Sequence, residues 1–212
     1  MFVGHLGIGL LAKRAEPKIS LGTWMLAVML ADLVAFPLLI VGVERFSGSL
    51  GTRIAYSHSL LMVALWAALF AWAYFSQRHY RRGAWLLFAA VLSHWPLDVV
   101  SHRPDMPLAP GVHAVFGAGL WSSVPATLAL EGGFWLLAII FYVRATHPAR
   151  RTGFYGFWIG AALLTLSWYS NITKGMELNQ VKAGIGGLIF FSLMVAWAYW
   201  MNRARPAFKV PI

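Results

Sequence analysis

The chain has 212 residues, of which 59% are hydrophobic and only 11% are charged, whereas about a quarter of the residues in ordinary soluble domains are charged. This composition argues against an ordinary soluble domain and indicates a protein embedded in lipid. The chain has no cysteine, which excludes disulfides and thiolate metal sites, so any metal site must use histidine and carboxylate ligands. A net charge of +10 is high enough for nucleic-acid binding, and the distribution of the basic residues decides whether that interpretation applies.

The first twelve residues, MFVGHLGIGLLA, are apolar but too short to cross a bilayer. Lys13 and Arg14 follow this stretch instead of preceding it, and no small-residue cleavage site is present, so a signal peptide is not indicated. We expect a short helix that enters the bundle, is covered by neighbouring helices and carries His5 toward the midplane.

Six longer apolar stretches follow, each near the length of about 20 residues that crosses a hydrocarbon core of about 30 Å. They cover residues 21–43, 54–75, 84–100, 122–143, 154–172 and 184–201. No internal repeat or linker divides the chain. The sequence therefore predicts an all-α fold, a polytopic membrane helical bundle of about six transmembrane helices plus a short N-terminal helix, in one domain of residues 1–212.

Twelve of the seventeen lysine and arginine residues lie in every second segment between the spans or in the C-terminal tail. They form four clusters: Lys13, Arg14 and Lys18; Arg78, Arg81 and Arg82; Arg144, Arg150 and Arg151; and Arg203, Arg205 and Lys209. Because cytoplasmic loops carry an excess of such residues, we expect an integral protein of the bacterial inner (cytoplasmic) membrane with both termini cytoplasmic. Membrane lipid, not nucleic acid, is the expected partner of these clusters.

Ionisable residues within the predicted spans are few, and each costs at least ~2.5–3.5 kcal/mol at the bilayer centre on insertion scales. They are Asp32 in the first span, His58 at the start of the second, His94 and Asp98 in the third and Glu131 in the fourth, with His102, Arg103 and Asp105 in the loop after the third. The predicted topology brings them to similar depths, between the midplane and the outer face. One water-filled pocket, open to the non-cytoplasmic side, can therefore contain them.

His94, Asp98 and His102 are four residues apart, so on a continuous helix they stack on one face. Pro96 removes a backbone hydrogen bond and should kink that helix near His94. An imidazole and a carboxylate at this spacing suit a divalent cation such as zinc, whose nitrogen and oxygen ligands lie at about 2.0–2.2 Å. Taken singly, His58 also fits an interface residue and Asp32 an ion pair with an arginine, but the whole cluster favours a metal site.

These residues occur in a characteristic order. His5 lies in GHLG, Asp32 follows in the first span, residues 53–59 read R-x-x-x-S-H-S, and residues 93–98 read S-H-x-x-L-D with a histidine after them. This order resembles the membrane-bound metal-dependent hydrolase family, the YdjM-like proteins, regarded as distantly related to the zinc-dependent phospholipase C and P1 nuclease group. The resemblance covers roughly residues 1–135. It implies that His5, Asp32, His58, His94 and Asp98 are metal ligands and that Asp98 is a candidate to bridge two ions.

The chain departs from the pattern of the soluble relatives, which have a second pair, H-x-x-x-E. Here His113 is followed at the fourth position by Gly117, and His102 and Glu131 are the candidates to replace that pair. The last two apolar stretches, within residues 154–201, lack ionisable residues and are predicted to be scaffold.

A site of this kind predicts hydrolytic chemistry. One or two divalent ions lower the pKa of a bound water to about 7 and stabilise charge on a phosphoryl or carbonyl oxygen. Asp105 or Glu131 is then the candidate general base, while Arg53 and Arg103 are candidates to hold an anionic head group. The prediction is a membrane-embedded, metal-dependent (zinc) hydrolase, a phosphoesterase acting on a phosphoester, a lipid or a lipid-linked substrate.

Two other functions remain open from the sequence. In a proton- or metal-coupled transporter, the carboxylates and histidines form a relay, although the inner halves of the spans are almost purely apolar. In a non-enzymatic membrane scaffold, the cluster only ties helices together. A zinc metalloprotease and a serine hydrolase are disfavoured because neither H-E-x-x-H nor G-x-S-x-G occurs. Ser57, Ser59, Ser93 and Ser101 are expected to hydrogen-bond beside the histidines or to cap helices.

Overall fold

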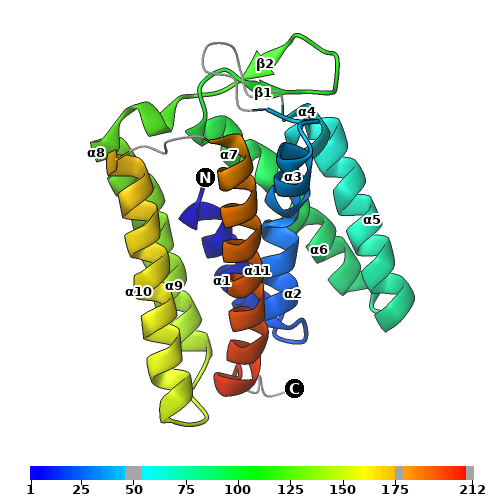
Figure 1. Ribbon diagram of the computed structural model, residues 1–212. Helices are drawn as coiled ribbons and strands as arrows, with labels where there is room; N and C mark the ends of the chain where they lie inside the picture. Colours follow the sequence, from blue (N-terminus) through cyan, green and yellow to red (C-terminus); the bar gives the residue numbers. More distant parts are fainter. Residues whose placement is uncertain (46–53, 175–178, 209–212) are drawn as a thin grey trace.

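The computed structural model describes residues 1–45, 54–174 and 179–208. Over these residues the chain is all-α apart from one short antiparallel ribbon of two strands (Figure 1). The elements are α1 (Val3–Ala15), α2 (Leu21–Val28), α3 (Leu30–Ile40), α4 (Ala55–His58), α5 (Leu60–Arg78), α6 (Arg81–Leu92), α7 (His94–Ser101), β1 (Met106–Pro107), β2 (Val115–Phe116), η1 (Leu120–Ser122), α8 (Val124–Thr127), η2 (Leu128–Gly132), α9 (Gly133–Ala145), α10 (Arg151–Lys174) and α11 (Gln180–Ala204).

Four helical segments in the described part of the chain are long and apolar enough to cross a membrane. They are Leu60–Arg78, Arg81–Ser101, Val124–Ala145 and Gln180–Ala204. The pair α2 and α3, bent by 54°, makes a fifth if it counts as one broken span. The prediction of an all-α bundle with membrane-spanning helices is thus confirmed in its coarser form, with four or five such helices.

Breaks interrupt three of the predicted spans, and each break adjoins a predicted ligand. Residues 21–43 form two helices that meet at Met29, and Asp32 lies in the first turn of the second. Ser59 separates α4, which ends at His58, from α5, and its hydroxyl caps α5 by accepting a hydrogen bond from the Met62 amide. Ser93 separates α6 from α7, which begins at His94. This last break lies where Pro96 predicts a kink, because proline has no N–H to bond the carbonyl four residues earlier.

Helix α1 lies inside the bundle, packed against α2 on one side and α9 on another. Two glycines allow this close approach, as small residues do between membrane helices. A Cβ at Gly9 would lie 2.9 Å from the Met25 sulfur, and one at Gly7 would lie 2.7 Å from the Phe134 ring. Helix α11 packs along α2 and α3, and α5 packs along α6.

The element ends that carry the described residues of the predicted basic clusters meet at one end of the bundle, in the lower part of Figure 1, and Lys209 falls outside the described residues. There the Tyr80 hydroxyl donates to Glu16 at 2.8 Å, and the Arg205 Nε donates to the Thr146 hydroxyl at 2.8 Å. Helix α1 ends at this face, whereas Met1 lies within the bundle beside Ser101. The alternation of basic segments along the chain therefore corresponds to one end of the folded molecule.

Candidate metal centre

The six predicted ligands come from four helices and the residue that follows one of them, and they gather in the interior of the bundle, toward the end opposite the basic clusters. They are His5 on α1, Asp32 on α3, His58 on α4, His94 and Asp98 on α7, and His102 directly after α7. His5, His58, His94 and Asp98 are each at most 5% exposed. Asp32 and His102 are half-buried and line a cavity.

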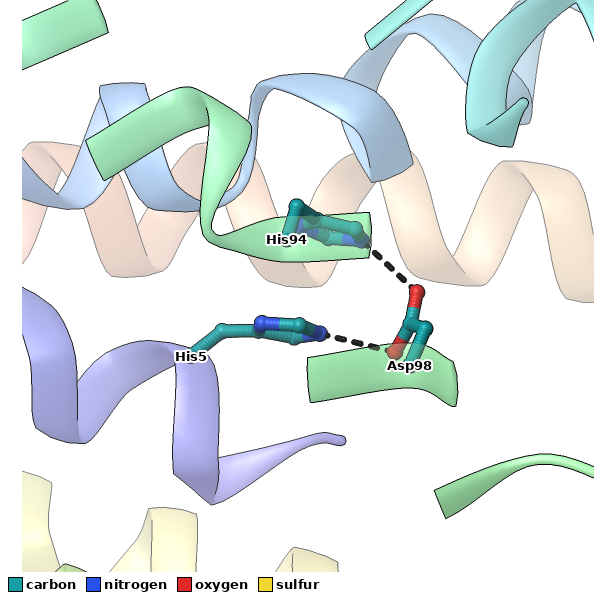
Figure 2. A group of neighbouring side chains, drawn as sticks. All are labelled: His5, His94 and Asp98. Atoms are coloured by element: carbon teal, nitrogen blue, oxygen red, sulfur yellow. Dashed lines mark hydrogen bonds and ion pairs between the residues drawn. The ribbon is translucent and has the colours of Figure 1, made fainter. Parts of the chain in front are cut away.

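Asp98 is at the centre of one group. One carboxylate oxygen lies 3.0 Å from His5 Nε2, and the other lies 3.2 Å from His94 Nε2 (Figure 2). The two imidazole rings stack, with centroids 3.8 Å apart and planes 7° apart. The Met1 ammonium also donates to Asp98, and it donates to the Ser101 hydroxyl at 2.8 Å. A positive charge therefore lies beside this carboxylate in the structure.

Asp32, His58 and His94 form a second group, which shares His94 with the first. The Asp32 oxygens lie 3.3 Å from His58 Nε2 and 3.9 Å from His94 Nε2. Within each group the possible ligand atoms all lie within 4.8 Å of one another. Neighbouring ligands of a tetrahedral zinc ion are about 3.4 Å apart, given bonds of about 2.0–2.2 Å. Both groups can therefore hold a metal ion.

The tautomer of His94 strengthens this conclusion. Its Nδ1 lies 2.9 Å from the carbonyl oxygen of Val28, the last residue of α2. Because a carbonyl only accepts hydrogen bonds, Nδ1 carries a proton, and Nε2 is the nitrogen that remains for a second proton or a metal ion. Among the described residues, no hydrogen-bond donor reaches this buried Nε2, which faces a carboxylate oxygen of Asp98. Two acceptors at 3.2 Å require a cation between them, either a proton or a metal ion.

His58 is oriented by a chain of hydrogen bonds that the sequence analysis did not predict. Its Nδ1 lies 2.7 Å from the Ser57 hydroxyl, which donates to a Glu44 oxygen at 2.7 Å. The other Glu44 oxygen accepts from the amides of Tyr56 and Ser57 at 2.9 and 2.8 Å. Since the serine proton points to Glu44, the hydroxyl accepts from His58 Nδ1–H, and Nε2 turns its lone pair to Asp32. Nothing in the spacing of the sequence links the fully buried Glu44 to His58.

His102 lies at the end of α7, which stops at Ser101, so the predicted continuous helix face covers only His94 and Asp98. Even so, His102 Nε2 comes within 4.0 Å of an Asp98 oxygen. Its Nδ1 is 3.2 Å from Asp105, and its ring lies against Trp121 with centroids 4.9 Å apart. Asp105, predicted as a general base, is thus in direct contact with a candidate ligand.

Glu131, the other predicted general base, is fully buried in η2. One oxygen accepts from the Gly4 amide at 3.1 Å and the other from the Trp121 indole at 3.0 Å. These bonds fix the start of α1 and the ring that packs on His102. They favour a positioning role for Glu131 over proton transfer, because both oxygens already accept hydrogen bonds.

Of the remaining predicted residues, Arg103 and His113 are exposed. Arg53, predicted to bind a head group, falls outside the described residues. Ser57 and Ser59 fulfil the predicted serine roles, Ser57 by its bond to His58 and Ser59 as a helix cap.

A cavity of about 600 Å³ adjoins the cluster. His5, Asp32, His58, Asp98 and His102 form its polar end. The rest of its wall comes mainly from α3, α10 and α11, so the two helices predicted to be scaffold line the same cavity as the candidate ligands.

Comparison with protein-family models, curated proteins and solved structures finds no match for this chain. The case for the candidate metal centre therefore rests on the chain's own residues and contacts.

Proposed function

We propose that the protein is a membrane-embedded, metal-dependent hydrolase that cleaves phosphoesters with one or more zinc ions at this centre. One observation carries the proposal. Two sets of histidine and aspartate side chains share the buried His94, and the Nε2 of His94 faces Asp98. The resemblance of the sequence motifs to the membrane-bound metal-dependent hydrolases is in accord with it.

The residues divide into ligands and groups that orient them. The two groups of candidate ligands share His94, whose Nε2 can bind one ion at a time, so an ion would be held either by His5, His94 and Asp98 or by Asp32, His58 and His94. A divalent ion at such a site supplies a bound water of lowered pKa and a positive charge for a phosphoryl oxygen. The carbonyl of Val28 and the hydroxyl of Ser57 engage Nδ1 of His94 and His58, which leaves Nε2 of each ring as the nitrogen that can face a metal ion.

Proton transfer is assigned to the pair of His102 and Asp105. His102 lines the cavity, and its Nε2 is the nitrogen nearer to Asp98, while Asp105 holds the opposite nitrogen. In this proposal His102 accepts the proton of the attacking water, and Asp105 stabilises the imidazolium that results. Arg103, which directly follows His102, and Arg53, five residues before His58, bind the anionic head group in this proposal.

We propose six spans, with the bent pair of α2 and α3 as one and the 24-residue α10 as the sixth. The basic end of the bundle, with the C-terminal segment, then faces the cytoplasm of a bacterial cell. The metal centre opens on the other side of the inner membrane. A relay for transport has less support, since α1 continues from His5 toward the basic end with the fully buried Leu6 and Leu10.

The test is an activity assay on protein reconstituted in discs of neutral lipid and loaded with zinc. Release of nitrophenol from p-nitrophenyl phosphate and from its diester is measured for the native protein, for Asp98→Asn and for a control, Glu16→Gln. Glu16 is a buried carboxylate at the basic end, bonded to Tyr80. We expect Asp98→Asn to lower turnover by more than the ~10–100-fold typical of groups that only orient ligands. Equal turnover in Asp98→Asn and native protein, or no turnover by folded, zinc-loaded native protein, would contradict the proposal.

A further inference from the structure

The cavity beside the metal centre has two chemically different ends. One end carries the histidines and carboxylates of the centre. The other extends along apolar side chains of three helices: Ala35, Phe36 and Leu39 of α3, Ile172 of α10, and Phe190 and Phe191 of α11. Ser167 and Asn171, one turn apart on α10, add two polar side chains to this wall. A ligand that fits both ends needs a polar head and an apolar tail.

Small residues on α11 keep the apolar end open. Gly187 allows α11 to approach α3, since a Cβ there would lie 2.3 Å from the Phe36 ring. Gly186 also lines the cavity, but a Cβ there would meet nothing within 4 Å. Gly186 is exposed, so the space beside it is not needed for helix packing in the described part of the chain, and a larger side chain at this position would stand at the edge of the cavity.

The size of the cavity indicates what kind of tail it can take. Its volume of about 600 Å³ lies in the usual range of small-molecule sites, roughly 300–1,000 Å³. If each heavy atom or methylene takes about 30 Å³, the share of one water in the liquid, the cavity holds on the order of 20 such groups. That is enough for a phosphate and one hydrocarbon chain of about a dozen carbons.

The charges at the polar end of the cavity indicate the chemistry of the ligand's polar head. The two groups of candidate ligands at the polar end can hold a divalent ion. With cations in place, this end attracts an anionic oxygen ligand, while the apolar wall excludes charge. Phosphate as the head follows from the hydrolase function proposed above, and this inference rests on that function.

We propose that the cavity binds a single-chain phosphoester amphiphile, with its phosphate at the metal centre and its one hydrocarbon chain between α3, α10 and α11. Chain length then decides which phosphoesters the protein prefers, because each methylene that leaves water for the apolar wall adds to binding. The protein would thus act on lipid fragments with one tail in preference to short soluble esters.

The experiment compares butyl phosphate with dodecyl phosphate, using zinc-loaded protein in discs of neutral phosphatidylcholine. It uses the native protein, Gly186→Leu and the control Gly133→Leu. Gly133 is a matched control for Gly186, because a Cβ at Gly133 also meets nothing within 4 Å among the described residues. Unlike Gly186, Gly133 is not among the residues that line the cavity. One readout is the ratio of kcat/KM for dodecyl phosphate to that for butyl phosphate. The other is photo-cross-linking by a dodecyl phosphate that carries a diazirine on its chain, mapped by mass spectrometry.

We expect the native protein and Gly133→Leu to prefer dodecyl phosphate by at least 10-fold and to be cross-linked on α3, α10 or α11. Gly186→Leu should lower that preference at least 10-fold and lose the cross-links. Hydrolysis of both esters at similar rates in all three proteins would overturn the proposed binding site for the hydrocarbon chain and would leave the hydrolase function standing. Cross-links only on lipid-facing surfaces, unchanged by Gly186→Leu, would also overturn it. A third outcome is that neither ester is hydrolysed but cross-links form in the cavity and Gly186→Leu abolishes them. This outcome would support the binding site for the hydrocarbon chain and count against the hydrolase function alone.

Discussion

At the scale of single residues, three of the four histidines of the candidate centre have their second nitrogen engaged, whereas the buried Nδ1 of His5 has no hydrogen-bond partner among the described residues. His94 uses Nδ1 to bond the Val28 carbonyl, His58 uses it to bond Ser57, and His102 uses it to bond Asp105. Metal-binding histidines in proteins are usually held by such outer partners, which fix the tautomer and the ring orientation. The three partners are of different types, yet each leaves Nε2 turned toward an aspartate of the cluster.

Removing one of these partners should weaken metal binding without removing a ligand. We expect Ser57→Ala to lower zinc affinity by roughly 10–100-fold, because His58 loses its orienting bond and Glu44 loses a donor. The measurement is a competition titration against a chelating dye. Ser76→Ala is the control, since Ser76 is exposed on α5 and bonds only the backbone of its own helix. Equal affinity in Ser57→Ala and native protein would count against the orienting role of Ser57.

Much of this residue set can be predicted from the sequence, because histidines and aspartates within apolar spans are conspicuous. The spacing of His94 and Asp98 and the ordered motifs identify residues that the fold brings together. The Val28 carbonyl cannot be predicted in this way, since a backbone group has no residue signature. Glu44 lies at the end of an apolar stretch, where a charged residue is unremarkable, and only the fold brings it to Ser57.

At the scale of elements, the helices are interrupted where ligands must turn inward. The apolar pattern predicts a single span over residues 21–43, but the structure has a bend of 54° at Met29. Met29 is neither proline nor glycine, while Pro37 stands inside the second helix. The bend therefore could not be predicted from residue type. By contrast, Pro96 did predict the interruption next to His94, because its missing N–H acts locally.

The loop after α7 depends on one close backbone contact. A Cβ at Gly117 would lie 2.0 Å from the Arg103 carbonyl oxygen and 2.7 Å from that of His102. We expect Gly117→Ala to displace this backbone and to destabilise the protein by about 1–3 kcal/mol, the usual range for overpacking. Thermal unfolding in detergent is the measurement. Gly133→Ala, with nothing near its Cβ, should instead be neutral or stabilising by up to about 1 kcal/mol, as alanine favours helix. Similar melting temperatures for the two variants would contradict the steric account.

At the scale of the whole molecule, the basic segments of the chain meet at one end of the bundle, and the candidate centre lies toward the other. The alternation of lysine and arginine along the sequence predicts this arrangement. The cavity could not be predicted, because α10 and α11 contribute to it through small, apolar and uncharged residues that also suit a scaffold.

The proposed orientation can be tested with single cysteines, because the native chain has none. His113 and His147 are both exposed, the first in the loop near the ribbon and the second between α9 and α10 at the basic end. We expect a membrane-impermeant maleimide to label His113→Cys in intact bacterial spheroplasts and His147→Cys only after the spheroplasts are permeabilised. The reverse pattern would place the basic end outside.

The central claim is that the buried histidines and aspartates bind a metal ion. The most direct measurement is elemental analysis of native protein purified without chelators, beside His94→Ala and the control His147→Ala, with all three checked for monodispersity. His147 is an exposed histidine at the basic end, remote from the cluster, so His147→Ala should not change the zinc content. We predict near-stoichiometric zinc in the native protein and in His147→Ala, and little or none in folded His94→Ala. Native protein without metal, and with no greater affinity for added zinc than His94→Ala, would contradict the account.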